Sequence, residues 1–258
     1  VARERRGVKG PGRLARRLLD LLGRDGATDT VYPVGFHGDA YLLEVVELLL
    51  ARSERFAETG SNVGSTLGWV ARQHPDLPCL SCEPDSRSHD RATEHLSELD
   101  NVELFREPSG LFLDRLLRRE VHRHATTFWL DAHGGDWEWP LEEEIRRISG
   151  RWDRAHVLVD DCRVPGRDWF GWDSYGGVDC GPELVLDSIA PGRDDWSLWV
   201  PAYRERTSEH HPLRGWCLLL LGEEGGPGGE LAARLGTKDF LERHAGPDAP
   251  SPDEPGAA

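Results

Sequence analysis

Residues 56–72, FAETGSNVGSTLGWVAR, constrain the fold of this chain most, because a short apolar stretch leads through an acidic residue into a glycine-rich turn and then a helix-like segment. Glycine at Gly60 and Gly64 permits a tight turn and a close approach of the backbone to a ligand. The spacing is G-x-x-x-G, whereas the dinucleotide fingerprint is G-x-G-x-x-G, and the sequence here lacks the Lys-Ser or Lys-Thr pair of a phosphate-binding loop. The segment therefore indicates either a nucleotide-cofactor turn outside the NAD and ATP types or ordinary turn chemistry after a strand.

A second signal follows at a compatible distance. Residues 77–82 (LPCLSC) are an apolar stretch that predicts a second strand, and this stretch ends at Glu83. Glu83 lies 19 residues beyond Gly64. A carboxylate at the end of the second strand is placed to accept hydrogen bonds from ribose hydroxyls. The two signals together favour a cofactor site over simple turn chemistry.

These residues resemble two motifs of the class I S-adenosylmethionine-dependent methyltransferases, with E-T-G-S-N-V-G similar to their glycine motif and C-E-P-D similar to their acidic-loop motif. The resemblance implies that Glu58 and Gly60 flank the methionine part of the cofactor and that Glu83 holds its ribose. The later stretch VELFREPSGLFLDRLL resembles the third strand and the loop beside the adenine, with Ser109 at the matching position and Pro108 where family members often have Asp. The cofactor-binding residues predicted in this way are Glu58, Gly60, Ser61, Asn62, Gly64, Ser65, Glu83 and Ser109.

The rest of the chain alternates apolar strands with helical segments. Residues 126–130 (TTFWL) and 156–159 (HVLV) predict strands, and residues 39–52 and 141–148 have helical apolar patterns. Such alternation predicts a parallel sheet covered by helices on both faces, with ligands beyond the carboxyl ends of the strands. With the ending typical of the family, the expected fold class is α/β, a Rossmann-like doubly wound, mostly parallel sheet with an antiparallel C-terminal strand. The last strands are expected at residues 184–189 and 216–221.

Three carboxylates are expected to meet beyond the ends of two neighbouring strands, namely Asp131, Asp160 and Asp161. No Arg or Lys is evident between them, so they would repel one another, and a hard divalent cation is the common remedy. The pattern resembles that of the metal-dependent sugar O-methyltransferases of macrolide and aminocoumarin biosynthesis, which implies magnesium on these three side chains. The alternative is that Asp131 contacts the cofactor or caps a helix, while Asp160 and Asp161 open a solvated loop.

His133 is the candidate general base, because an imidazole titrates near neutrality and this one stands two residues past Asp131. A structural role is the alternative for a lone histidine in a loop. Two other classes of function also stay open. One is a metal-dependent hydrolase that uses Asp131, His133, Asp160 and Asp161, and the other is a noncatalytic module that keeps the cofactor fold for binding.

Tryptophan is the outlier of the composition, with ten in the chain. Trp137 and Trp169 follow the predicted strands 126–130 and 156–159, where their rings could form a wall for a flat or sugar-like acceptor. Core packing is the alternative for this pair. It is the expectation for Trp69, Trp129 and Trp152. The segment before the first helix, with Tyr32, Phe36 and His37, is expected to close over the cofactor, as N-terminal segments do in related methyltransferases.

Net charge and cysteine content limit the possible partners and cellular settings of the chain. The formal net charge of −15 argues against a nucleic-acid partner, because no basic face would offset phosphate repulsion. Five cysteines, an odd number, without a signal peptide or a long apolar run predict a reduced, cytoplasmic setting and no membrane partner. Cys79 and Cys82 form a C-x-x-C without a second ligand pair, so we expect them to pack within a strand. A small-molecule acceptor is the predicted partner, and homo-oligomerisation stays open.

The length of 258 residues suits one α/β domain. We expect a basic N-terminal arm at residues 1–28, a methyltransferase-like domain at 29–222 and a Gly/Pro-rich tail at 223–258 with a short helix within 230–244. The sequence as a whole predicts an enzyme that transfers a methyl group from S-adenosylmethionine to a hydroxyl of a small-molecule acceptor, with magnesium as a second cofactor.

Overall fold

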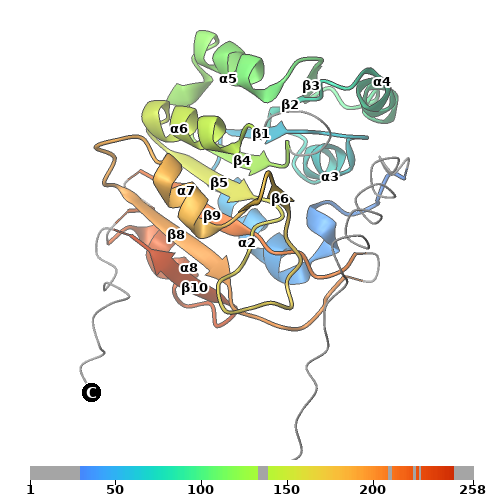
Figure 1. Cartoon of the computed structure of the whole chain (residues 1–258). Coiled ribbons are helices and arrows are strands. Elements are labelled where there is room, and N and C mark those ends of the chain that lie inside the picture. Colours follow the sequence, from blue (N-terminus) through green and yellow to red (C-terminus); the bar gives the residue numbers. More distant parts are fainter. Residues whose placement is uncertain (1–29, 133–138, 209–210, 223–224, 227, 247–258) are drawn as a thin grey trace, which may run out of the picture.

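The structure is a computed structural model, and it describes residues 30–132, 139–208, 211–222, 225–226 and 228–246. Within these residues an eight-stranded sheet runs through the molecule in the strand order β10-β8-β9-β5-β4-β1-β2-β3 (Figure 1). Two short strands, β6 and β7, form a hairpin of their own. The strands are Arg55–Thr59 (β1), Cys79–Cys82 (β2), Val102–Phe105 (β3), Thr126–Leu130 (β4), Ala155–Val159 (β5), Ser174–Tyr175 (β6), Val178–Asp179 (β7), Trp196–Pro201 (β8), Cys217–Leu221 (β9) and Leu241–Ala245 (β10).

The pairing of the strands is parallel on one side of the sheet and antiparallel on the other. Strands β1 to β5 pair in parallel, while β9, β8 and β10 add antiparallel pairings beyond β5. Every residue of β4 and β5 is buried, as expected for strands whose two faces are both covered. The predicted fold class is therefore confirmed, and the antiparallel part is larger than the single strand that was expected.

Helices cover both faces of the sheet. α5, α6 and α7 lie side by side over one face, and α2 lies against the other (Figure 1). α2 begins after Asp39, whose carboxylate accepts hydrogen bonds from the amides of Tyr41 and Leu42. Its apolar stripe, which includes Val45 and Leu49, is buried. The helices are Phe36–Gly38 (η1, a 3-10 turn), Ala40–Leu50 (α2), Ser65–Gln73 (α3), Ser86–His95 (α4), Ser109–Arg118 (α5), Val121–Arg123 (η2), Leu141–Arg151 (α6), Pro182–Ser188 (α7) and Glu230–Leu235 (α8).

Large aromatic side chains fill the core. Trp129 in β4 and Trp152 after α6 are buried, which confirms the expectation for both. Trp69 in α3 is partly buried and packs against the same core. Cys79 and Cys82 are buried in β2, as expected of packing residues.

One prediction about the C-terminal third is wrong, and another is right only in part. Residues 184–189 were expected to form a strand, but 182–188 form α7, and the strand that pairs with β9 is β8. Pro182 lies in the first turn of α7, where its missing N–H and fixed φ suit a helix start. The expected helix over residues 230–244 ends at Leu235, and residues 241–245 form β10 at the edge of the sheet. The sheet therefore continues beyond residue 222.

Candidate active site

A cavity of about 300 Å³ opens beyond the carboxyl ends of β1 and β4. Three parts of the chain enclose it, namely the turn between β1 and α3, the segment that precedes α2 and the segment that precedes β9. Ligands bind at this edge in open α/β sheets. The cavity is lined by Thr30, Tyr32, Val34, Phe36, His37, Glu58, Gly60, Ser61, Asn62, Val63, Ser65, Thr66, Asp131, His211, Pro212 and Arg214.

The turn between β1 and α3 presses its backbone against the neighbouring strand end. Gly60 has a φ of +82°, and a Cβ at this position would lie 2.5 Å from the carbonyl oxygen of Asp131. The amides of Gly60 and Ser61 donate hydrogen bonds to the carbonyl of Cys82 at 3.0 and 3.1 Å, which ties the turn to the end of β2. Glycine is therefore required at position 60 for its backbone angle and for its lack of a side chain.

Glu83 supports this turn from the end of β2. Its carboxylate accepts a hydrogen bond from the Asn62 amide at 2.8 Å and another from the Asp85 amide at 2.9 Å. Burial raises the pKa of Glu83, while these two amide hydrogen bonds oppose the rise. Glu83 does not line the cavity. The structure thus brings the glycine turn and the predicted ribose carboxylate together, with the Asn62 amide as the link.

Glu58 and Ser61 supply the polar groups deepest in the cavity wall. Glu58 is 1% exposed, and the Ser81 hydroxyl donates a hydrogen bond to its carboxyl at 2.9 Å. Burial raises the pKa of Glu58 to about 8; the Ser81 hydrogen bond opposes the rise and the charge of Glu83 adds to it. The buried hydroxyl of Ser61 has no hydrogen-bond partner within the described part of the chain. A buried carboxyl and an unpartnered hydroxyl in one wall fit a ligand that brings a cation and a polar group.

The segment before α2 closes over the cavity, as the resemblance implied. The Tyr32 amide donates to the Ser65 hydroxyl at 3.0 Å, and the Phe36 amide donates to the Thr66 hydroxyl at 3.4 Å. Both acceptors belong to the first turn of α3. The Ser65 side chain, predicted as a cofactor contact, therefore accepts a hydrogen bond from the protein itself, although the residue lines the cavity. Tyr32, Phe36 and His37 all lie in the cavity wall.

Besides Glu83, two more of the predicted cofactor residues, Gly64 and Ser109, do not line the cavity. Gly64 precedes α3 with a φ of +79°, and a Cβ there would meet the Leu96 side chain at 2.9 Å. Its role in the structure is the turn itself and the packing of α3 against the segment after α4. Ser109 is the buried first residue of α5.

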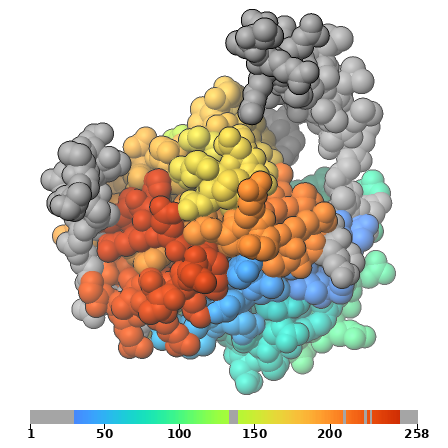
Figure 2. Space-filling model, turned by 90° about the horizontal axis from the view of Figure 1, so that it is seen from below, coloured from blue at the N-terminus to red at the C-terminus, as the bar shows by residue number. Residues whose placement is uncertain are grey.

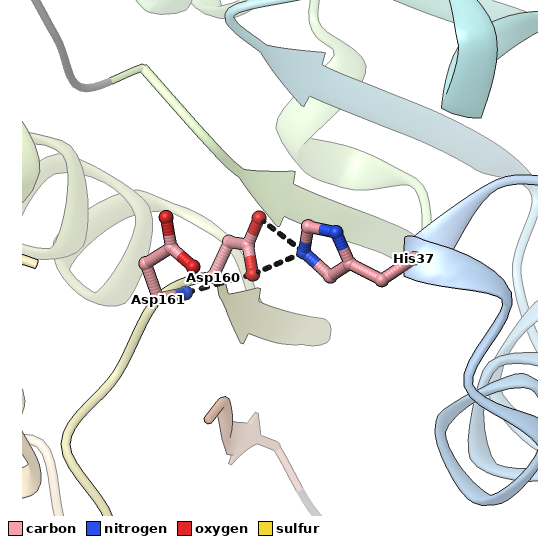
Figure 3. A group of neighbouring side chains, drawn as sticks. All are labelled: His37, Asp160 and Asp161. Atoms are coloured by element: carbon pink, nitrogen blue, oxygen red, sulfur yellow. Dashed lines mark hydrogen bonds and ion pairs between the residues drawn. The ribbon is translucent and has the colours of Figure 1, made fainter. Parts of the chain in front are cut away.

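The carboxylates after β5 have basic partners, contrary to the prediction that none would lie between them. His37 Nε2 lies 2.8 Å from each carboxylate oxygen of Asp160 (Figure 3). Asp160 lies between His37 and Asp161, and its carboxylate accepts a hydrogen bond from the Asp161 amide at 2.7 Å (Figure 3). The Arg214 guanidinium is paired with Asp161 and donates to Asp173 at 2.8 Å.

The His37–Asp160 pair is an ion pair at neutral pH. Burial by itself would lower the pKa of His37, but the Asp160 carboxylate, with smaller contributions from Asp131 and Asp161, raises the pKa to about 9. Backbone strain accompanies this contact, since Phe36 and His37 have φ values of 53° and 57°. Placing the imidazole against Asp160 therefore costs conformational energy in the backbone of the segment before α2.

The donor set does not fit the predicted magnesium site. Among the described residues, ligand atoms of His37, Asp160 and Asp161 lie within 4.8 Å of one another, and Asp131 is not part of this group. Magnesium prefers six oxygen ligands in near-ideal octahedral geometry, whereas this group offers an imidazole held by a carboxylate and a second carboxylate held by Arg214. Magnesium therefore stays a prediction of the sequence.

The structure tests the predicted position of Asp131 but not that of His133. Asp131 lines the cavity, and its amide donates to the Thr59 carbonyl at 3.0 Å, so its position at the end of β4 is fixed by β1. His133 and Trp137 lie outside the described residues, so the predicted base and one predicted wall residue stay predictions.

Arg214 lines the cavity and pairs with Asp161, and the sequence alone did not indicate it as a site residue. β9 pairs antiparallel with β5, with Cys217 opposite Val159, so the residues before β9 lie beside those after β5. This pairing places Arg214 next to Asp161. No local motif marks the residue. The antiparallel ending expected for the family could have indicated this contact, because it places the residues before the last strand beside the residues that follow β5.

Comparisons with known proteins agree with this architecture. No family model and no curated protein match the sequence. Among solved structures, the chain is similar to the O-methyltransferase TomG of Streptomyces achromogenes, which is involved in tomaymycin synthesis and was solved with S-adenosylmethionine; the TM-score is 0.55, with 19% identity over 83% of this chain and 92% of that one. It is also similar to an O-methyltransferase of Bacillus cereus solved with S-adenosylhomocysteine, with a TM-score of 0.52 and 11% identity over 82% of this chain and 92% of that one.

At these low sequence identities, the structural similarity establishes the fold of this chain and nothing more specific. The chain has the Rossmann-like α/β fold of the class I S-adenosylmethionine-dependent methyltransferases. Within the described residues, every helix is too short or too polar to span a lipid bilayer.

Proposed function

We propose that this chain is an S-adenosylmethionine-dependent methyltransferase that transfers a methyl group to a hydroxyl of a small-molecule acceptor. The observation that carries the proposal is the buried carboxyl of Glu58 in the wall of a cavity that the glycine turn also lines. The cofactor's ammonium and sulfonium are cations, and a buried carboxyl with a raised pKa favours a cationic ligand over a neutral or anionic one.

The residues around Glu58 support the same assignment. Gly60 lines the cavity and lets the turn press against the end of β4, and Ser61 offers a hydroxyl without a partner within the described residues. Asn62 belongs to the turn that Glu83 braces. We assign cofactor contact to Glu58, Gly60, Ser61 and Asn62, and indirect support of the turn to Glu83.

When bound, S-adenosylmethionine supplies the methyl group and a sulfonium leaving group. The task of the protein is then to align an acceptor oxygen with the methyl carbon and to assist the loss of its proton. His37 does not suit the role of base at neutral pH, because it is protonated and held by Asp160. Asp131 lies in the cavity wall, and His133 stays the predicted base.

Calorimetry tests the proposal through the proton on Glu58. With a pKa of about 8, this carboxyl is mostly protonated at pH 7, and a cation bound beside it would expel the proton. Titration of S-adenosylmethionine at pH 7 in phosphate and in Tris, which differ in ionisation enthalpy, should reveal proton release. The Glu58→Gln variant should bind more weakly and release no proton through this group, whereas the exposed control Glu98→Gln should behave as the parent chain.

The outcomes separate the classes of function. Absence of S-adenosylmethionine binding would refute the proposal. Binding without proton release would leave the function standing and remove Glu58 from its assigned role. Binding without methylation of any hydroxylated acceptor would favour the noncatalytic module. The alternative of a metal-dependent hydrolase is weakened, because it required free carboxylates at Asp160 and Asp161, and these are paired with His37 and Arg214.

A further inference from the structure

A second hollow of about 440 Å³ adjoins the cofactor cavity. Pro212 and Arg214 belong to the walls of both, so they form the partition between them. Figure 2 shows the residues near 170, in yellow, packed against the residues near 200, in orange, on one face of the molecule. The hollow is lined by Asp168, Trp169, Phe170, Gly171, Trp172, Pro212, Leu213 and Arg214.

Trp169 presents a fixed aromatic surface in this hollow. Trp169 is 40% exposed, whereas tryptophan is highly buried on average. The ring is nevertheless held in place, since its Nε1 donates to the Tyr203 carbonyl at 3.0 Å and the Arg204 guanidinium lies 5.2 Å from the ring centroid. An exposed ring that is already immobilised loses little conformational entropy when a ligand packs on it.

The floor of the hollow is also fixed. The Gly171 amide donates to the Leu213 carbonyl, and the Gly215 amide donates to the Gly171 carbonyl, both at 2.9 Å. A Cβ at Gly171 would lie 3.0 Å from Arg214 Nη1, so the backbone of this loop packs directly on the guanidinium. The two loops therefore form one rigid surface next to the partition.

The charges around the hollow disfavour an anion. Two guanidinium groups lie at the hollow: Arg214 faces the carboxylates of Asp161 and Asp173, and Arg204 lies over the Trp169 ring. Asp168 adds another carboxylate to the lining, and the whole chain has a formal net charge of −15. An anionic ligand would meet excess negative charge here, whereas an uncharged or cationic ligand would not.

We propose that this hollow is the acceptor site and that it binds a hydroxylated ring, uncharged or cationic, with one face of the ring on Trp169 and a hydroxyl directed past Arg214 toward the cofactor cavity. The inference rests on the proposed methyltransferase function. Aromatic and sugar rings both offer a face that packs on an indole and hydroxyls that can be methylated. Phosphorylated and carboxylated forms of the same rings are disfavoured by charge.

Ligand-observed NMR on the full chain, saturated with S-adenosylhomocysteine, tests this assignment. The uncharged and cationic probes are catechol, dopamine, methyl glucopyranoside and glucosamine, and the anionic counterparts are 3,4-dihydroxybenzoate and glucose 6-phosphate. We expect at least one of the first four rings to bind, and its anionic counterpart to bind at least tenfold more weakly. The aromatic and the sugar probes distinguish the two sources of such a ring.

Variants at Trp169 locate the binding. Trp169→Ala should weaken ring binding at least tenfold, and Trp169→Phe, which keeps an apolar face, should weaken it less. Leu111→Ala is the matched control, because Leu111 is 54% exposed on α5 and lies outside both cavities. The affinity for S-adenosylhomocysteine should be the same in all three variants, which also shows that they are folded.

Three results would overturn the assignment: no probe binds the parent chain, the anionic counterparts bind as tightly as the others, or Trp169→Ala binds like the parent. Failure of S-adenosylhomocysteine itself to bind is a different result. It would refute the proposed function rather than the acceptor site alone.

Discussion

Substitution of Gly60 by alanine should destabilise the folded chain by roughly 2–5 kcal/mol. The φ of +82° costs an L-residue roughly 1–2 kcal/mol. The new Cβ would lie 2.5 Å from the Asp131 carbonyl oxygen, 2.8 Å from its carbonyl carbon and 2.9 Å from Ala132 Cα. All three are backbone atoms that cannot rotate away, and overpacking of this kind costs about 1–3 kcal/mol. The two costs add because they arise from different atoms.

Urea denaturation followed by far-UV circular dichroism measures this loss as a lower midpoint at an unchanged slope. Gly110→Ala is the control, since Gly110 lies in the first turn of α5 and a Cβ there has no heavy atom within 4 Å. It should leave stability unchanged or raise it by up to about 1 kcal/mol. If Gly60→Ala is as stable as Gly110→Ala, the turn does not press on the end of β4 and the geometry of the cavity wall is wrong.

Three further predictions concern the polar groups of the site. Ser61→Ala should change the free energy of unfolding by less than about 0.5 kcal/mol, because its hydroxyl has no partner in the described part of the chain. The same variant should weaken S-adenosylmethionine binding about fivefold in calorimetry. Unchanged affinity would remove Ser61 from the cofactor contacts. Glu83→Gln should weaken the same binding about tenfold with a smaller effect on the methyl-transfer rate, and the reverse pattern in single-turnover kinetics would contradict its role as a brace of the turn. The proton on His37 stabilises the fold fully below pH 6.5, and this stabilisation, no more than about 3 kcal/mol, should be lost as the pH rises through 9; urea midpoints at pH 6 to 10 should show a decline that is smaller in His37→Asn, and identical profiles would refute the ion pair with Asp160.

Local chemistry in the sequence was sufficient for the parallel part of the sheet and for one wall of the cavity. The apolar stretches 126–130 and 156–159 became β4 and β5, since short buried strands need little beyond apolar character and turn residues at their ends. The glycine turn could be placed because the backbone angle at Gly60 depends on that residue and its neighbours. Glu83 could be placed because it ends the apolar stretch 77–82, 19 residues beyond Gly64.

Residues 184–189 show where local patterns were ambiguous. Their apolar character suits a strand as well as a buried helix, and the helix start at Pro182 decided between them. β10 was missed for a related reason, because most of the segment LERHA was assigned to the helix expected within residues 230–244. Its place at the edge of the sheet depends on pairing with β8, which the segment itself does not encode.

The sequence by itself determined which residues end the strands, and hence that Glu58, Asp131, Asp160 and Asp161 share one edge of the sheet. Only the tertiary structure decided what those carboxylates contact. His37 reaches Asp160 across 123 residues and Arg214 reaches Asp161 across 53, so neither contact leaves a local pattern. Charges that look unpaired along the chain are neutralised by groups that the topology brings from elsewhere, because Coulomb energy depends on distance in space rather than along the sequence.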